Sequence, residues 1–266
     1  MTAARSTTMT EDYLKVIWKA QEWSEKSITT NEIAATLGVA ASSVSGNLKK
    51  LARDGFIDYE PYGRIDLSET GRALALTMVR RHRLIETYLV EQMGYSWDEV
   101  HDEAEVLEHA ISDRLLNRWD EVLGHPARDP HGDPIPRQDG TMVRPPAALL
   151  QDFADGQCGV IVRVSDDDPE LLRYLDTLHL AVGVHVRVEA HRAYAGTISV
   201  VRTSHQPGSN AAGSDAAAEP IAEASFELAA VVATSIWATT DPADDEHDGE
   251  HGNDHDSQTE GHHRAE

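Results

Sequence analysis

The chain of 266 residues is long enough for two or three small domains, each with its own core. Its residues are 40% hydrophobic with no apolar run of about eighteen, and it has one cysteine, Cys158, so a membrane span and a disulfide framework are excluded. With no leader-like N-terminus, the sequence predicts a cytoplasmic protein that makes no membrane contact. The net charge of −23 argues against nucleic-acid binding only if it is evenly spread. Residues 241–266 hold ten acidic side chains and one arginine, whereas residues 1–72 hold ten acidic and nine basic ones.

The first third of the chain has the pattern of a winged helix-turn-helix. Apolar residues recur at helical spacing over 11–24, 28–39 and 40–54, and the second of these begins with a Thr-x-x-Glu capping box and ends at a glycine. Two short helices joined by a tight glycine turn are typical of the DNA-binding motif. Apolar and polar residues then alternate on both sides of Pro61-Tyr62-Gly63, which predicts the hairpin called the wing.

The exposed face of the third helix carries hydroxyls, an amide and cations, with no acid before Asp54. Such side chains bond to base edges and neutralise phosphates. A trihelical motif without a DNA partner is the alternative, but this basic bias in an acidic chain favours DNA binding. The candidate DNA contacts are Ser42, Ser43, Ser45, Asn47, Lys49 and Lys50 on this helix and Arg64 in the wing.

Histidines and carboxylates follow in two groups. A long helix from a Ser68 cap to about Val90 carries His82 and Glu86, whose i, i+4 spacing suits either a chelate or a surface ion pair. Residues 101–109, wound as a helix, place His101, Glu105, Glu108 and His109 within roughly a quarter of the circumference. Nitrogen and carboxylate oxygen without sulfur suit a hard or borderline divalent cation, and a solvated acidic helix face is the alternative.

The next segments predict a dimer interface and a loop. The apolar residues of 84–123, including a helix over 112–123, exceed what the first domain needs, and a homodimer would present two recognition helices to a two-fold site. Residues 124–146 hold six prolines and three glycines and are expected to form a loop. Within it, the motif that begins at His131 is interpreted as turn chemistry rather than a metal site.

The rest of the chain predicts a small barrel-like β-domain and two segments without fixed structure. Residues 204–220 are a flexible insertion, and residues 238–266 an acidic, His-rich disordered tail whose alternative role is weak metal buffering. The elements of the β-domain are strands over 158–164, 184–188 and 197–201, a helix over 169–179, and a strand and helix within 221–237.

In this order the pieces resemble the diphtheria toxin repressor family of metal-dependent transcriptional regulators, and more closely its manganese-responsive branch. The residues that carry the resemblance are 81–86, 100–109 and 129–136, and it extends from Glu11 to Trp237. It implies a mainly α fold with a C-terminal β domain. The implied organisation is a winged helix-turn-helix over 1–73, a helical metal-binding and dimerisation domain over 74–144, a linker over 145–155 and an SH3-like (FeoA-like) β-barrel domain over 156–237.

The resemblance also implies two metal sites. Iron-responsive members have Met and Cys at the positions of Asp12 and Glu105, and two carboxylates there favour Mn²⁺ over softer ions. Some manganese-type members have a second acid where this chain has Lys15, so two separated sites are expected rather than a closely bridged pair. The implied ligands are Asp12, Glu105, Glu108 and His109 in the first site, and His82, Glu86 and His101 in the second, completed from the β-domain by Asp167, Asp168 or Glu170.

The function implied is a Mn²⁺-dependent repressor that binds a palindromic operator as a homodimer, represses metal-uptake genes and catalyses no reaction. An iron-dependent repressor of the same architecture is the main alternative, with Fe²⁺ as the activator. A metallohydrolase that uses the Glu/His cluster would instead need an open coordination position beside a general base. A metal-buffering protein built on the tail is the third alternative.

Overall fold

The computed structural model describes residues 7–24, 26–59, 63–203 and 223–240. The N-terminal unit is a winged helix-turn-helix, as predicted. Thr29 caps the second helix with the predicted capping box, and Gly38 turns the chain after it with a φ of +63°. The elements of the N-terminal unit are α1 (Thr8–Glu22), α2 (Thr30–Thr36), α3 (Ala41–Arg53), and the antiparallel strands β1 (Ile57–Tyr59) and β2 (Ile65–Leu67).

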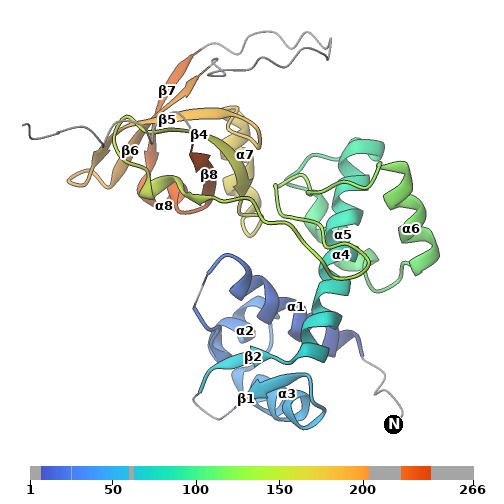
Figure 1. Cartoon of the computed structure of the whole chain (residues 1–266). Coiled ribbons are helices and arrows are strands. Elements are labelled where there is room, and N and C mark those ends of the chain that lie inside the picture. Colours follow the sequence, from blue (N-terminus) through green and yellow to red (C-terminus); the bar gives the residue numbers. More distant parts are fainter. Residues whose placement is uncertain (1–6, 25, 60–62, 204–222, 241–266) are drawn as a thin grey trace, which may run out of the picture.

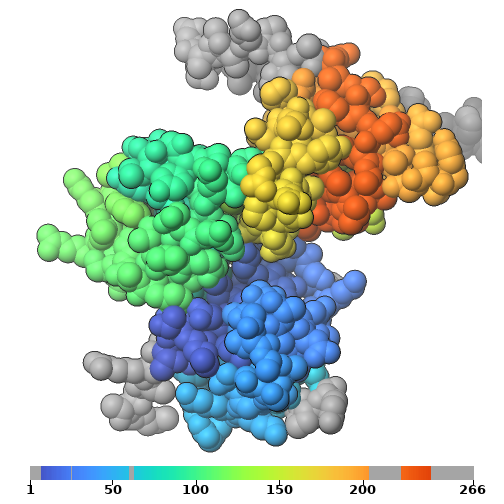
Figure 2. All heavy atoms as spheres, turned by 180° about the vertical axis from the view of Figure 1, so that it is seen from behind, coloured from blue at the N-terminus to red at the C-terminus, as the bar shows by residue number. Residues whose placement is uncertain are grey.

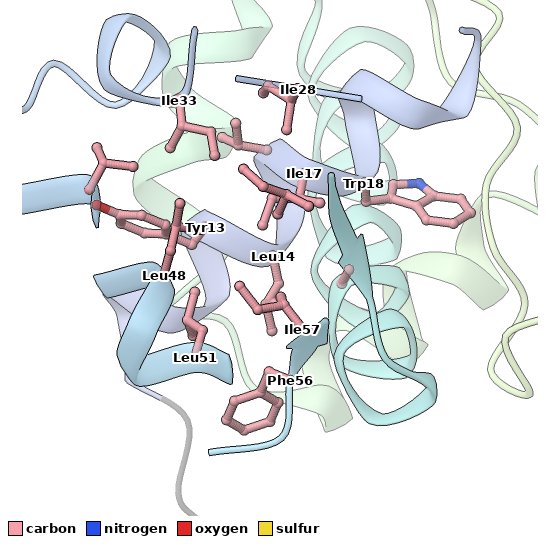
Figure 3. Packing of buried hydrophobic residues seen from close by; sticks show 14 of the residues in the cluster. Tyr13, Leu14, Ile17, Trp18, Ile28, Ile33, Leu48, Leu51, Phe56 and Ile57 are labelled. Carbon is pink, nitrogen blue, oxygen red and sulfur yellow. The ribbon is translucent and has the colours of Figure 1, made fainter. Parts of the chain in front are cut away.

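Helix α1 lies at the centre of this unit's core. Figure 3 shows its Tyr13, Leu14 and Ile17 within one buried cluster that also contains Ile33 of α2 and Leu48 of α3. Helix α1 also packs against α4, so its opposite face is turned toward the rest of the chain. One helix therefore serves both as the core of the DNA-binding unit and as its contact with the next unit.

A second, helical unit is built on α4 (Glu69–Met93), α5 (Val100–Leu107) and α6 (Asp113–Val122). Figure 1 shows α4 running from the N-terminal unit into this one. The helix predicted over 101–109 is two residues too long, because α5 ends at Leu107 and Glu108 and His109 follow in a turn. Val106 is 72% exposed, while Glu108 is buried. Helix α5 is therefore oriented so that the Glu108 carboxylate, just after its end, points into the protein interior.

The C-terminal unit is one antiparallel sheet with strand order β3-β8-β4-β5-β6-β7. Residues 145–155, predicted to be a linker, supply the edge strand β3 and the buried Leu150, because the apolar side chains there complete the core of this sheet. The bounds are β3 (Ala148–Leu149), η1 (Leu150–Asp152), β4 (Cys158–Val164), α7 (Pro169–Thr177), β5 (His185–Arg192), β6 (Thr197–Thr203), β7 (Ala224–Ala229), α8 (Ala230–Ala233) and β8 (Ile236–Thr240).

The predicted fold class, mainly α with a C-terminal β domain, is confirmed. Strand β8 runs past the expected start of the tail at 238, and the predicted insertion 204–220 and the tail from 241 lie outside the described residues. Among the helices that are described, none is long and apolar enough to cross a bilayer. Figure 2 shows α7, in yellow, against the helical unit, where Arg173 pairs with Asp98 at 3.3 Å.

Candidate metal centres and DNA-binding surface

The first candidate centre joins α1 to the turn after α5. Asp12 Oδ1 lies 2.8 Å from His109 Nε2, and Glu108 Oε1 lies 3.4 Å from the same nitrogen. Glu11 contacts the other ring nitrogen of His109 at 3.1 Å. Asp12 and His109 keep partial access to solvent, whereas the Glu108 side chain is 1% exposed. The three predicted ligands Asp12, Glu108 and His109 are therefore brought together.

Glu105, the fourth predicted ligand of this centre, faces Lys15 instead of Asp12. The buried Lys15 Nζ lies 2.7 Å from Glu105 Oε1 and 2.5 Å from Glu108 Oε1. Burial raises the pKa of Glu105, but the charge of Lys15 and its hydrogen bond outweigh burial and lower that pKa, so Glu105 is a carboxylate at neutral pH. The ammonium of Lys15 thus neutralises part of the acidic cluster from within.

The second candidate centre combines His82 and Glu86 of α4, His101 of α5, and Asp166 from the loop between β4 and α7. His82 Nε2 lies 2.9 Å from Glu86 Oε1, and His101 Nδ1 lies 3.5 Å from that oxygen and 3.6 Å from Asp166 Oδ2. Glu86 and Asp166 are both buried.

The β-domain contributes Asp166 rather than the residues predicted. Asp168 accepts the backbone N–H groups of Glu170 and Leu171 as the N-cap of α7, and Asp167 accepts a hydrogen bond from Ser165. Glu170 is exposed in the first turn of that helix. The structure does not bring the predicted Asp167, Asp168 and Glu170 into this group, because the first two form local hydrogen bonds and Glu170 is exposed, while Asp166 is buried.

His82 connects the two centres. Its Nδ1 lies 2.6 Å from Glu108 Oε2, while its Nε2 faces Glu86. Burial opposes the charged ring, but the charge of Glu86 and hydrogen bonds to Glu108 and Glu86 outweigh burial and raise the pKa of His82 to about 9. An ion that takes either nitrogen has to displace a proton.

A further group, Glu86, Asp129 and His131, adjoins the second centre, and sequence reasoning interpreted its loop as turn chemistry. That chemistry is present, since Asp129 Oδ1 accepts the backbone N–H groups of His131 and Asp133. Yet His131 is fully buried, and its Nε2 lies 2.7 Å from the carbonyl of Trp97, which only accepts, so Nε2 carries the proton and Nδ1 faces Glu86 at 3.9 Å. Burial and the Asp133 and Glu86 charges raise the pKa of Asp129 to about 8.

These donor sets fit a divalent metal ion. Buried polar atoms almost always have hydrogen-bond partners, yet Oε2 of Glu86, Oδ1 of Asp166 and Nδ1 of His131 have none. Glu86 belongs both to the group with Asp166 and to the group with His131, and these groups offer only nitrogen and oxygen. None of the potential ligand groups among the described residues contains a cysteine. The arrangement suits a hard or borderline cation.

Four of the seven predicted DNA contacts line a single groove, and three do not. A groove of about 820 Å³ is lined by Ser42, Ser45 and Lys49 of α3 together with Arg64 of the wing. Ser43 and Lys50 are exposed beside it, and Asn47 donates to the hydroxyl of Tyr13 at 3.1 Å. The groove has the recognition helix as one wall and the wing as the other.

A winged helix-turn-helix joined through α1 and α4 to clusters of nitrogen and oxygen ligands defines a metal-responsive DNA-binding regulator. Residues 6–65 match the N-terminal DNA binding domain of iron dependent repressors, residues 68–137 their metal binding and dimerisation domain, and residues 149–206 the FeoA domain. The iron-dependent repressor IdeR of Mycobacterium leprae (strain TN) is 30% identical over 210 residues, which cover 74% of this chain and 90% of that protein.

Solved structures agree in architecture. One described as a manganese-dependent transcriptional repressor in complex with manganese has a TM-score of 0.77 and 46% identity, covering 87% of this chain and 99% of that chain. The manganese regulator SloR has a TM-score of 0.68 and 30% identity, covering 87% and 98%. The chain belongs to the diphtheria toxin repressor family. It is a metal-dependent transcriptional repressor that binds DNA and carries a dimerisation domain, and it is not an enzyme.

Proposed function

We propose that this repressor responds to Mn²⁺. The observation that carries the proposal is the pairing of Asp12 with His109 and Glu108 in a group that offers carboxylate and imidazole and no cysteine sulfur. Hard oxygen donors favour Mn²⁺ over softer ions. The similar solved structure with 46% identity is described as a complex with manganese, which supports this choice. The relatives named as iron-dependent make Fe²⁺ the alternative activator.

We assign Asp12, Glu108 and His109, with Glu105 beside them, to a first centre, and His82, Glu86, His101 and Asp166 to a second. When bound, the ion supplies the positive charge that holds these carboxylates and imidazoles together. Asp12 belongs to the core helix of the DNA-binding unit, while Glu108 and His109 belong to the helical unit. Drawing Asp12 toward them fixes α1, and with it the recognition helix α3, before DNA is met, which lowers the ordering cost of binding.

The homodimer forms, in this proposal, through the helical unit. Val106 of α5 and Leu115 and Val122 of α6 are 72%, 45% and 53% exposed, an apolar surface that a second copy would cover. Two recognition helices related by a two-fold axis read a palindromic operator. Ser42, Ser43, Ser45, Asn47, Lys49, Lys50 and Arg64 are the proposed DNA contacts, and metal-uptake genes are the proposed targets.

A fluorescence anisotropy titration tests this function. The labelled duplex is a palindromic site upstream of a metal transporter gene, and the full chain is added with Mn²⁺, Fe²⁺, Zn²⁺ or chelator. We expect Mn²⁺ to promote binding at lower free concentration than Fe²⁺, and chelator to abolish it. Activation by Fe²⁺ at the lower concentration would replace the manganese proposal with the iron-dependent alternative.

A further inference from the structure

Helix α1 carries four ionic side chains in a single stripe toward the metal-binding region. Asp12, Lys15, Lys19 and Glu22 are spaced i, i+3, i+7 and i+10, which places them within roughly 80° of the helix circumference. Asp12 meets His109, Lys15 meets Glu105 and Glu108, Lys19 meets Asp166, and Glu22 meets Arg83. Of these five contacts, the one between Lys19 and Asp166 reaches a proposed ligand of the second centre.

The two carboxylate oxygens of Asp166 differ in their contacts. Lys19 Nζ lies 2.9 Å from Oδ2, and Oδ1 is buried without a hydrogen-bond partner. Lys19 and Asp166 line one small cavity with His82 and Glu86, about 10 Å³ in volume, which is close to the space of a single water-sized species. The oxygen held by α1 is also the one that lies 3.6 Å from His101 Nδ1, so Lys19 contacts the face of Asp166 that belongs to the second centre.

We propose that Lys19 is a positioning residue that couples the second centre to the DNA-binding unit. The inference rests on the proposed function, since it takes His82, Glu86, His101 and Asp166 as ligands of one ion. Lys19 holds Oδ2 beside His101 and so fixes the orientation of the Asp166 carboxylate at the ion, as outer-shell partners do for ligating carboxylates. Because coupling is reciprocal, an ion that orders Asp166 also orders Lys19 and α1, although α1 supplies no ligand there.

The sign of the effect separates positioning from simple repulsion. An ammonium that acted only as a nearby positive charge would weaken cation binding, so that its removal would tighten it. A positioning lysine gives the opposite result, because Asp166 without its partner loses its orientation. Lys19→Met keeps the aliphatic stem and removes the ammonium, and Lys19→Arg keeps the charge and the donors.

Isothermal titration calorimetry of the full chain with Mn²⁺ measures this directly. We expect two binding events per protomer in the wild type, and a loss of 10- to 100-fold in the affinity of one of them in Lys19→Met. Lys19→Arg should recover most of that loss, and Lys26→Met, at an exposed lysine beyond the end of α1, should match the wild type. Circular dichroism in chelator verifies that each variant is folded, and Lys19→Gln replaces Lys19→Met if the latter is not.

A double-mutant cycle completes the test. Asp166→Asn should weaken the same event, and adding Lys19→Met to it should cause no further loss, because the two residues act through one contact. Unchanged or tighter binding in Lys19→Met, or fully additive losses, overturns the inference and leaves the proposed function standing. A wild type that binds one ion per protomer overturns both the inference and the second centre on which it rests.

Discussion

Asp12 Oδ1 lies 2.8 Å from His109 Nε2, and this contact joins the central helix of the DNA-binding unit to the turn after α5. Beside it, Glu108 is buried while Asp12 and His109 remain partly accessible. An ion can therefore reach the centre from solvent and still be bound by both units. Under the proposed function, this contact is the route by which metal concentration controls the placement of a recognition helix to which the ion is not bound.

The choice of metal should depend on Glu105. We expect Glu105→Cys to shift the response toward softer ions, because thiolate ligands favour them over Mn²⁺. Operator binding titrated with Mn²⁺ and with Zn²⁺ measures the shift. The substitution should lower the Mn²⁺ response by roughly tenfold or more relative to the Zn²⁺ response. Glu103→Cys, on the exposed side of α5, is the matched control. An unchanged ratio of the two responses would remove Glu105 from the ligand set.

Ion binding at the second centre should release a proton near neutral pH. The pKa of His82 is raised to about 9, so the ring is charged at pH 7 and has to lose its proton to donate a lone pair. Mn²⁺ affinity should therefore increase between pH 7 and pH 9 and level off above. Calorimetry in two buffers of different protonation enthalpy should give different heats at pH 7, and His82→Gln should remove the difference. Equal heats in the wild type would exclude His82 as a ligand.

The same pKa shift links His82 to stability. Its pKa in the folded chain lies above the value of about 6.5 for an unperturbed histidine. The contribution of His82 to the free energy of unfolding is therefore complete below about pH 6.5 and is lost as the pH increases through about 9. Urea denaturation in chelator across this range, compared with His82→Gln, measures the contribution, and identical pH profiles for both proteins would contradict it.

Lys49 should contact a DNA phosphate, since it lines the groove between α3 and the wing. Lys49→Ala should lower the slope of log affinity against log salt by about one, because each neutralised phosphate releases about one counterion. Arg187→Ala, on strand β5 of the β-domain, should leave the slope unchanged. If Lys49→Ala also keeps the wild-type slope, this residue makes no phosphate contact.

Gly132 should be required for the loop that carries Asp129 and His131. Its φ is +92°, and a Cβ added there would lie 2.0 Å from the carbonyl oxygen of Val162. Gly132→Ala should lower the free energy of unfolding by about 1–3 kcal/mol or more, the cost of a strained backbone plus the collision. Gly196→Ala is a matched control, with a φ of +65° and open space around the site, and urea denaturation should show a smaller loss for it. Equal losses for the two variants would mean that the close approach of Gly132 to Val162 adds no cost when a Cβ is introduced.

Local sequence patterns correctly predicted the helix starts and the hairpin, because each pattern spans only a few residues. The capping box at Thr29 and Glu32, the Ser68 cap of α4 and the alternation around the wing all appear in the structure. The family resemblance supplied Asp12, which its position in a first turn alone would assign to a cap. These features depend on short spacing or on a pattern shared along the chain.

The remaining parts of the centres depend on how the units dock. Asp166 lies next to three acids of similar appearance, and the docking of the β-domain against α1 decides which acid turns inward. His131 belongs to a motif whose turn chemistry already accounts for its residues, so its burial beside Glu86 could not be inferred. The position of Lys15 was evident from the sequence, but the placement of its ammonium between Glu105 and Glu108 was not.

The central claim is that an ion bound between Asp12 and the helical unit activates DNA binding. The most direct measurement is the anisotropy of a labelled palindromic operator titrated with wild type, Asp12→Ala and the exposed control Glu103→Ala, each with Mn²⁺ and with chelator. We expect Mn²⁺ to increase the affinity of the wild type and of Glu103→Ala at least about tenfold, a typical coupling, and to leave Asp12→Ala unchanged while size-exclusion chromatography shows that it remains a dimer. An equal Mn²⁺-dependent gain in Asp12→Ala would contradict the account.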